Sequence, residues 1–224
     1  MDVVLAACGG KMFLAGGIVV SVLETAIILK IWKTYGIISE LSKEKKNAVM
    51  VLMIGISVLL NCFLFQNQKE LTDSINSIVV YTLLAGISGI DLKEKKIPNK
   101  LLLAGLVIRT GIILLECMIH SSEVKRILFY SVAGFLFGLV FLFILCMISR
   151  QGIGYGDVKL FAWLGYCVGI WDTYNILFYS ALFTACVGLF LVLVKKQSKK
   201  TEIPFGPFVF MGTYLVLFMK YFTP

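Results

Sequence analysis

The chain has 224 residues, of which 59% are hydrophobic and only 15% are charged, and its mean hydropathy is +0.92. A soluble domain of this length carries more charge, so the composition excludes the soluble globular classes and indicates a polytopic membrane protein without a separate soluble domain. The net charge of +8 is therefore interpreted first as a signal of membrane topology.

Eight apolar runs are candidates for crossing a bilayer, which takes about 20 helical residues, or fewer when a helix is buried among others. The sequence thus predicts an all-α membrane protein with about eight transmembrane helices. The third and the sixth runs are short. In chain order the runs cover residues 12–32, 48–65, 75–90, 101–119, 127–148, 157–171, 175–194 and 205–222.

The basic residues alternate between the two sides that these spans define. Fifteen of the 21 lysines and arginines fall beside the first, third, fifth and seventh connections, and five fall on the opposite side. The positive-inside rule then places those four connections in the cytoplasm and both termini outside. Topology explains the basic charge, so we expect no nucleic-acid partner.

Four of the 13 acidic residues lie within or at the end of a predicted span, namely Glu24, Asp91, Glu116 and Asp157. The predicted topology puts Asp91 and Asp157 on the same membrane face. Two carboxylates at one depth can share a proton and activate a water molecule, as in aspartic proteases. The alternative is that each acid only marks a helix end at the membrane surface.

The sequences around these two acids carry recognisable motifs. Asp91 is followed after five residues by Ile-Pro-Asn. Asp157 is the fourth residue of a Gly-x-Gly-Asp-x-Lys motif, and residues 203–208 read Ile-Pro-Phe-Gly-Pro-Phe. Together, in this order, the three motifs resemble the type IV prepilin peptidase family of intramembrane aspartic proteases. The resemblance covers roughly residues 75–224.

The resemblance implies one transmembrane peptidase domain over residues 1–224, with Asp91 and Asp157 as the catalytic pair. It also implies cleavage of the leader peptides of prepilin or pseudopilin-like proteins at the cytoplasmic face of a bacterial inner membrane. No metal and no cofactor are expected. The other residues that it implicates would bind substrate or shape the site, and these are Pro98, Asn99, Gly154, Gly156 and Lys159.

Each of these flanking residues also has a purely structural interpretation. Pro98 and Asn99 can simply begin a helix, Pro by its fixed φ and Asn as an N-cap. Gly154 and Gly156 can form a turn, or can let an extended substrate lie against the backbone. Lys159 can anchor a helix end by extending its amine toward water.

One departure from the family pattern lies at residues 33–47. Long members of the family carry a cytoplasmic domain with paired Cys-x-x-Cys motifs after the first span, and they N-methylate the new terminus. Here the same place holds a short lysine-rich loop without cysteine. The chain therefore resembles a short form, without motif support for methyltransferase activity, S-adenosylmethionine or zinc.

Helix dipoles suggest how the two acids divide the chemistry. Asp157 begins a predicted helix, where the dipole favours an anion, whereas Asp91 ends one, where it does not. Asp157 would then be the ionised base that activates water, and Asp91 the protonated partner that polarises the scissile carbonyl. The two would titrate as a unit.

Arg109 lies within the fourth predicted span, where a lone cation is unfavourable. We expect a carboxylate partner, either Glu116 two turns later or Glu24 on the first span. The family motifs assign no role to these three residues.

Two other functions compete with the peptidase hypothesis. An ion-coupled transporter predicts acids near the bilayer midplane on broken helices and two related halves, and the sequence contains no repeat. A presenilin-like protease shares Gly-x-Gly-Asp, but it pairs Tyr-Asp with Pro-Ala-Leu, whereas here Ile90 precedes Asp91 and the late motif is Pro-Phe-Gly-Pro.

Overall fold

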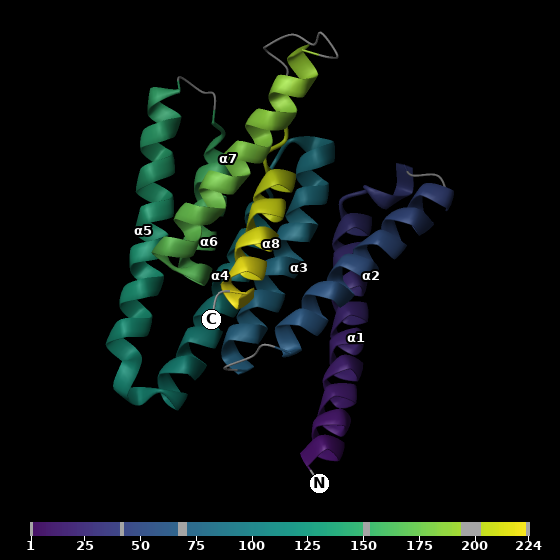
Figure 1. Cartoon of the computed structure of the whole chain (residues 1–224). Coiled ribbons are helices and arrows are strands. Elements are labelled where there is room, and N and C mark those ends of the chain that lie inside the picture. Colours follow the sequence, from purple (N-terminus) through teal and green to yellow (C-terminus); the bar gives the residue numbers. More distant parts are fainter. Residues whose placement is uncertain (1, 41–42, 67–70, 150–152, 194–202, 223–224) are drawn as a thin grey trace.

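The computed structural model describes residues 2–40, 43–66, 71–149, 153–193 and 203–222. Within these ranges the chain forms eight α-helices and two short 3-10 helices, and no strand (Figure 1). The prediction of an all-α protein is confirmed. The helices are α1 (Asp2–Thr34), α2 (Lys43–Gln66), α3 (Leu71–Glu94), α4 (Asn99–Ile119), α5 (Val124–Ile148), α6 (Tyr155–Val168), α7 (Ile170–Leu193) and α8 (Gly206–Phe222).

Each helix overlaps one predicted apolar run, but the boundary between α6 and α7 differs from the prediction. The sixth run was expected to extend to residue 171, whereas α6 ends at Val168 and α7 begins at Ile170. Gly169 separates them with φ +84°, in the left-handed region that glycine adopts without strain. Because apolar residues continue on both sides of Gly169, a prediction from hydropathy does not detect the break between the two helices.

Four helical segments are long and apolar enough to cross a membrane by length and composition. Two shorter apolar segments, Asn47–Leu59 and Gly206–Lys220, lie below that length. The described residues therefore have the long apolar helices of a membrane protein. The four segments are Leu71–Glu94, Asn99–Ile119, Ser121–Ile148 and Ile170–Leu191.

Successive helices run in alternate directions through the molecule (Figure 1). The C-terminal ends of α1, α3, α5 and α7 therefore lie at the same end of the bundle as the N-terminal ends of α2, α4, α6 and α8. All three sequence motifs fall at this end, at the junctions from α3 to α4, from α5 to α6 and from α7 to α8. We call it the motif end.

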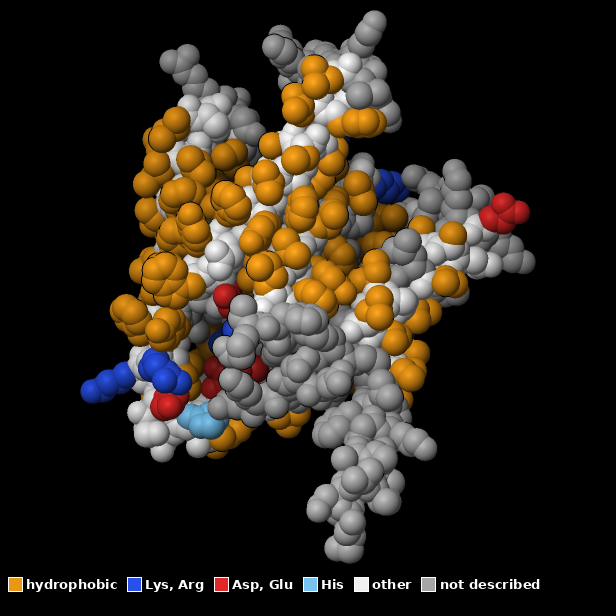
Figure 2. Space-filling view, viewed as in Figure 1, with side chains coloured by type: hydrophobic (Ala, Val, Ile, Leu, Met, Phe, Trp, Pro, Cys, Tyr) orange, Lys and Arg blue, Asp and Glu red, His pale blue; other side chains and the backbone are white. Residues whose placement is uncertain are grey.

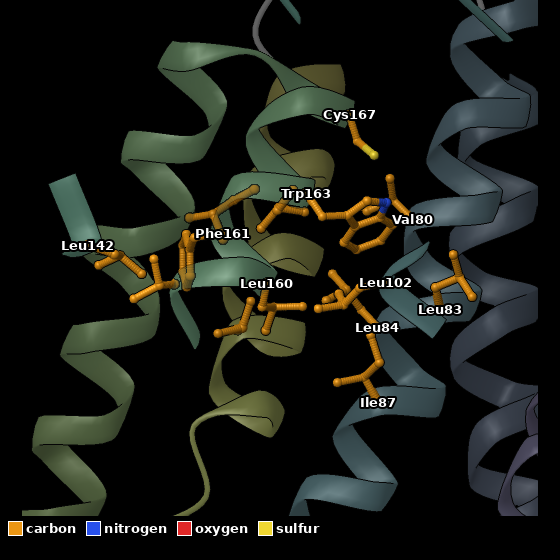
Figure 3. Close-up of a cluster of buried hydrophobic side chains, with 14 of the residues drawn as sticks. Val80, Leu83, Leu84, Ile87, Leu102, Leu142, Leu160, Phe161, Trp163 and Cys167 are labelled. Atoms are coloured by element: carbon orange, nitrogen blue, oxygen red, sulfur yellow. The ribbon is translucent and has the colours of Figure 1, made fainter. Parts of the chain in front are cut away.

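Helix α6 forms the centre of the hydrophobic core (Figure 3). Its Leu160, Phe161 and Leu164 are fully buried. A helix of 14 residues rises about 21 Å, which is less than the hydrocarbon thickness of about 30 Å. Because α3, α4, α5 and α7 all pack against it, its ends can remain inside protein rather than lipid.

Helices α5 and α6 touch through their backbones. Gly134 and Gly138, four residues apart on α5, face the backbone of α6. A Cβ added at Gly138 would overlap the carbonyl oxygen of Phe161, and one at Gly165 would overlap the carbonyl oxygen of Gly134. Such pairs of small residues allow close helix packing in membranes, and here they fix the position of α6.

The exterior of the bundle is apolar over α5, α7 and α8 (Figure 2). Apolar side chains that do not pack against another helix remain exposed on this surface. A surface that faces lipid requires such side chains, because lipid tails are themselves apolar. Exposed apolar residues on these helices and on α4 include Val107, Leu114, Phe129, Met147, Phe178, Leu189 and Met211.

A buried polar cluster joins α1, α2 and α3. Asn61 of α2 donates through Nδ2 to Glu24 Oε2 of α1 at 2.6 Å and to Ser21 Oγ at 3.1 Å. Thr82 of α3 lies 3.5 Å from the other carboxyl oxygen of Glu24. Side-chain hydrogen bonds between helices contribute to association in a bilayer, so this cluster attaches the first helical pair to the core.

Arg109 pairs with Glu116, one of the two partners expected from the sequence. Both side chains are buried, and Nη1 and Nη2 of Arg109 lie 2.7 Å and 3.3 Å from the two carboxyl oxygens of Glu116. This two-contact pairing is the strong form of an arginine–carboxylate interaction. It neutralises the buried cation within α4, whereas Glu24 is occupied by the polar cluster.

The glycine contact between α5 and α6 leads to a prediction of stability. The substitution Gly138→Ala pushes a methyl group against backbone that cannot rotate away, so we expect the free energy of unfolding to fall by about 1–3 kcal/mol. Thermal unfolding in detergent measures the effect. Gly55→Ala on α2 is the matched control because its added Cβ meets nothing within 4 Å; equal losses in the two variants would contradict this packing.

Candidate active site

Asp91 lies in the last turn of α3 and is 5% exposed. The backbone N–H of Gly206, the first residue of α8, donates a 2.7 Å hydrogen bond to its Oδ2. The backbone N–H of Phe205 is a second donor. A carboxyl group at the C-terminal end of its own helix is therefore held by the N-terminal end of another.

Gly206 fits at this contact because it has no side chain. A Cβ there would lie 3.0 Å from Oδ2 and 3.1 Å from Cβ of Asp91, closer than ordinary contact allows. The neighbouring Phe205 ring stacks on Phe161 of α6 with 6.0 Å between ring centroids. Helix α8 is thus positioned against α6 and Asp91 at once.

Asp157 lies in the first turn of α6. Its Oδ2 accepts a hydrogen bond from the backbone N–H of Gly154 at 3.3 Å. This is the carboxylate half of a capping box, in which a side chain three residues into the helix satisfies the N-terminal N–H. Asp157 and Asp91 thus both lie at the motif end, on separate helices.

The two motifs that contain the acids meet directly. Gly156 lies against Ile97, because a Cβ added at Gly156 would be 3.3 Å from the Cβ of Ile97. Lys159 Nζ of α6 donates to Asn99 Oδ1 of α4 at 3.3 Å. The start of α4 and the start of α6 are therefore neighbours at the motif end.

Asn99 is not an N-cap, contrary to the structural interpretation of the sequence. Helix α4 begins with Asn99 as its first residue, and Pro98 occupies the N-cap position in extended conformation. The Pro98 carbonyl accepts the backbone N–H of Leu101 at 3.1 Å. The Asn99 side chain is left to accept the bond from Lys159.

Neither of the two described glycines before Asp157 adopts a left-handed conformation, and only Gly156 is short of space for a side chain. Gly154 is extended, with φ −75° and ψ 145°, a conformation open to any residue. Gly156 needs its lack of a side chain because Ile97 occupies the space beside it. Residue 152, the first of the three glycines, lies outside the described residues.

The dipole argument from the sequence does not hold in three dimensions. It placed Asp91 at an unfavourable helix C-terminus, but the N-terminus of α8 and its N–H groups face the same carboxyl group. Both carboxyl groups thus accept hydrogen bonds at a helix N-terminus, and helix N-termini stabilise anions. Gly206 and Phe205 act as backbone donors toward Asp91, and Gly154 acts as one toward Asp157.

The contribution of α8 was the feature that sequence reasoning did not place. The Pro-Phe-Gly-Pro motif was recognised, yet none of its residues was assigned to the site. The available signal was Gly206, which lies between Pro204 and Pro207 at the start of an apolar helix. Among the described residues, no group of three or more His, Cys, Asp or Glu side chains is arranged to hold a metal.

Residues 78–189 match the model of the type IV leader peptidase family. Several curated proteins named prepilin leader peptidase/N-methyltransferase are similar. The one from Xanthomonas campestris pv. campestris is 28% identical over 142 residues, which cover 63% of this chain and 49% of that protein. The one from Bacillus subtilis is 30% identical over 139 residues, 62% of this chain and 53% of that protein.

A third relative, from Stutzerimonas stutzeri, is 31% identical over 140 residues, which cover 60% of this chain and 46% of that protein. The chain thus spans about half the length of the curated relatives that it matches. No solved structure matches.

The contact between Ile97 and Gly156 predicts a disulfide. Paired cysteines need Cβ atoms about 3.5–4.5 Å apart, and these positions lie at 3.3 Å. We therefore expect Ile97→Cys with Gly156→Cys to cross-link under mild oxidation, as measured by mass spectrometry of the digested protein. Ile97→Cys with Gly111→Cys, far along α4, should not. A cross-link in neither pair would show that the two motifs do not meet.

Proposed function

The chain belongs to the type IV leader peptidase family, and from this premise we propose that it is a membrane aspartic endopeptidase. Its substrates would be prepilin or pseudopilin-like proteins, from which it removes the leader peptide. The observation that supports the proposal is that Asp91 and Asp157, on separate helices, both lie at the motif end, together with all three family motifs.

In the proposed reaction, the two carboxyl groups hold one proton between them. Asp91, which two backbone N–H groups stabilise as an anion, takes a proton from a water molecule as that water attacks the scissile carbonyl. Asp157, in its neutral form, donates its proton toward the carbonyl oxygen. Collapse of the tetrahedral intermediate passes a proton to the leaving amine and restores one shared proton.

The remaining motif residues would shape the site around this pair. Lys159 and Asn99 join α6 to α4 through their side chains, and Pro98 sets the first turn of α4. Gly156 lets α6 approach Ile97 closely. We assign these residues, together with Gly154, to positioning the two acids and to the path of the substrate chain.

The proposed enzyme crosses the bacterial inner membrane eight times, with the motif end in the cytoplasm. The alternating helix directions and the lysine-rich connections at that end both support this topology. Helix α6 does not need to match the bilayer thickness because other helices surround it. Residues 1–224 would form one transmembrane peptidase domain.

The proposal does not include N-methylation. The curated relatives carry peptidase and N-methyltransferase in one name, but residues 33–47 of this chain contain none of the paired cysteines of the family's long members. Leader cleavage needs only the two acids and water. The proposed activity therefore requires no cofactor.

Neutralising either acid tests the proposal. We expect Asp91→Asn and Asp157→Asn each to lower prepilin cleavage at least about 100-fold, since each removes one partner of the acid–base pair. Co-expression with a prepilin and immunoblotting for leader removal gives the measurement. Asp172→Asn is the control, because Asp172 pairs with Lys220 away from the motif end. Normal processing by either site variant would refute the pair.

A shared proton also predicts the dependence of the rate on pH. Cleavage needs one neutral and one ionised carboxyl group, so kcat/KM should fall in acid, where both are protonated, and in base, where both are ionised. A purified enzyme with a prepilin peptide in detergent supports this measurement. A rate that stays constant into strong acid would exclude an ionised aspartate as the base.

A further inference from the structure

We propose that Trp32 of α1 is a positioning residue for Asp91, holding the last two turns of α3 in the geometry that cleavage requires. The inference rests on the proposed function, because it assigns Trp32 a task in the same site. Helix α1 lies outside residues 78–189, which match the family model.

The first contact is a hydrogen bond from the Trp32 side chain to the backbone of α3. The indole Nε1 donates to the carbonyl oxygen of Gly86 at 3.1 Å, across 54 positions of the chain. Trp32 is 8% exposed. A buried indole N–H needs such a partner, so the bond fixes the orientation of the ring over α3.

The second contact places the ring directly on the turn before Asp91. A Cβ added at Gly89 would overlap Nε1 and Cε2 of Trp32, and it would lie 2.6 Å from Cζ2. Gly89 precedes Asp91 by two residues. The indole therefore covers the backbone of α3 where any other residue would push α1 away.

A third contact holds α3 on the other side of Asp91. Lys93 Nζ donates to the carbonyl oxygen of Gly36 at 3.0 Å. Gly36 has φ +69° and lies in the turn that follows α1. In the same turn the backbone N–H of Ile37 donates to the Trp32 carbonyl at 2.8 Å. The end of α1 thus contacts α3 at residues both before and after Asp91.

These contacts act at the end of α3, where the start of α8 supplies the other support for Asp91. Helix α3 stops at Glu94, and Lys95 has φ +51°, so no further helical turn stabilises the one that carries Asp91. Helix ends fray when tertiary contacts do not hold them. A misplacement of about 1 Å in a catalytic group can lower the rate about 100-fold.

The test is a pair of substitutions that create and then relieve a clash. Gly89→Ala sets a methyl group against the indole and should lower kcat at least about tenfold. Adding Trp32→Ala removes the indole and should raise kcat above that of Gly89→Ala alone. We expect KM to change less than about twofold in both variants, since Trp32 contacts the backbone of α3 and not the substrate.

Gly111→Ala on α4 is the matched control, because its added Cβ meets nothing within 4 Å; it should behave as the wild type. The inference is overturned if Gly89→Ala has the same kcat as this control. It is also overturned if the double variant, Gly89→Ala with Trp32→Ala, has a kcat no higher than that of Gly89→Ala alone. If Gly89→Ala lowers both kcat and the melting temperature, and adding Trp32→Ala restores neither, the contact has only a structural role and the inference is also overturned.

A second variant covers the case in which Gly89→Ala does not fold. Trp32→Phe keeps an aromatic ring over Gly89 but lacks the donor to Gly86. Hydrogen exchange at the backbone of residues 89–94 should be faster in this variant than in the wild type, while exchange in α5 should not change. Unchanged exchange at residues 89–94 would overturn the inference. Because this measurement needs no substrate, its result does not depend on whether the proposed function is correct.

Discussion

The hydrogen bond from the start of α8 to Asp91 is the constraint on which the rest of the site depends. A carboxyl group that is 5% exposed in a membrane protein needs donors or a counter-charge. Backbone N–H groups supply the donors without a second buried charge. The consequence is that α3 and α8 must meet at the motif end, and the stacking of Phe205 on Phe161 extends this contact to α6.

Much of the fold follows from hydropathy and charge, and much of the site does not. Eight apolar runs predicted eight helices, and Glu116 was one of two partners expected for Arg109, seven positions away on the same helix. The break at Gly169 escaped because apolar residues lie on both sides of it. The bond between Gly206 and Asp91 joins positions 115 residues apart, and no local pattern encodes which helix end meets which.

The same distinction separates the residues that define the family from those that support them. The matched residues 78–189 contain both acids. Two supports of Asp91 lie outside them, namely the N-terminus of α8 and the indole of Trp32. The small residues at which these two supports approach α3 and Asp91, Gly89 and Gly206, are therefore part of the arrangement that holds the site.

The central claim is that two acids from different helices form one site, and the most direct measurement is a cross-link between their positions. Asp91→Cys with Asp157→Cys should be joined by a short thiol-reactive bridge in membranes, as detected by mass spectrometry of the linked peptides. Asp91→Cys with Asp172→Cys should not be joined. A bridge in the first pair alone is the predicted result, and no bridge between positions 91 and 157 would contradict the account.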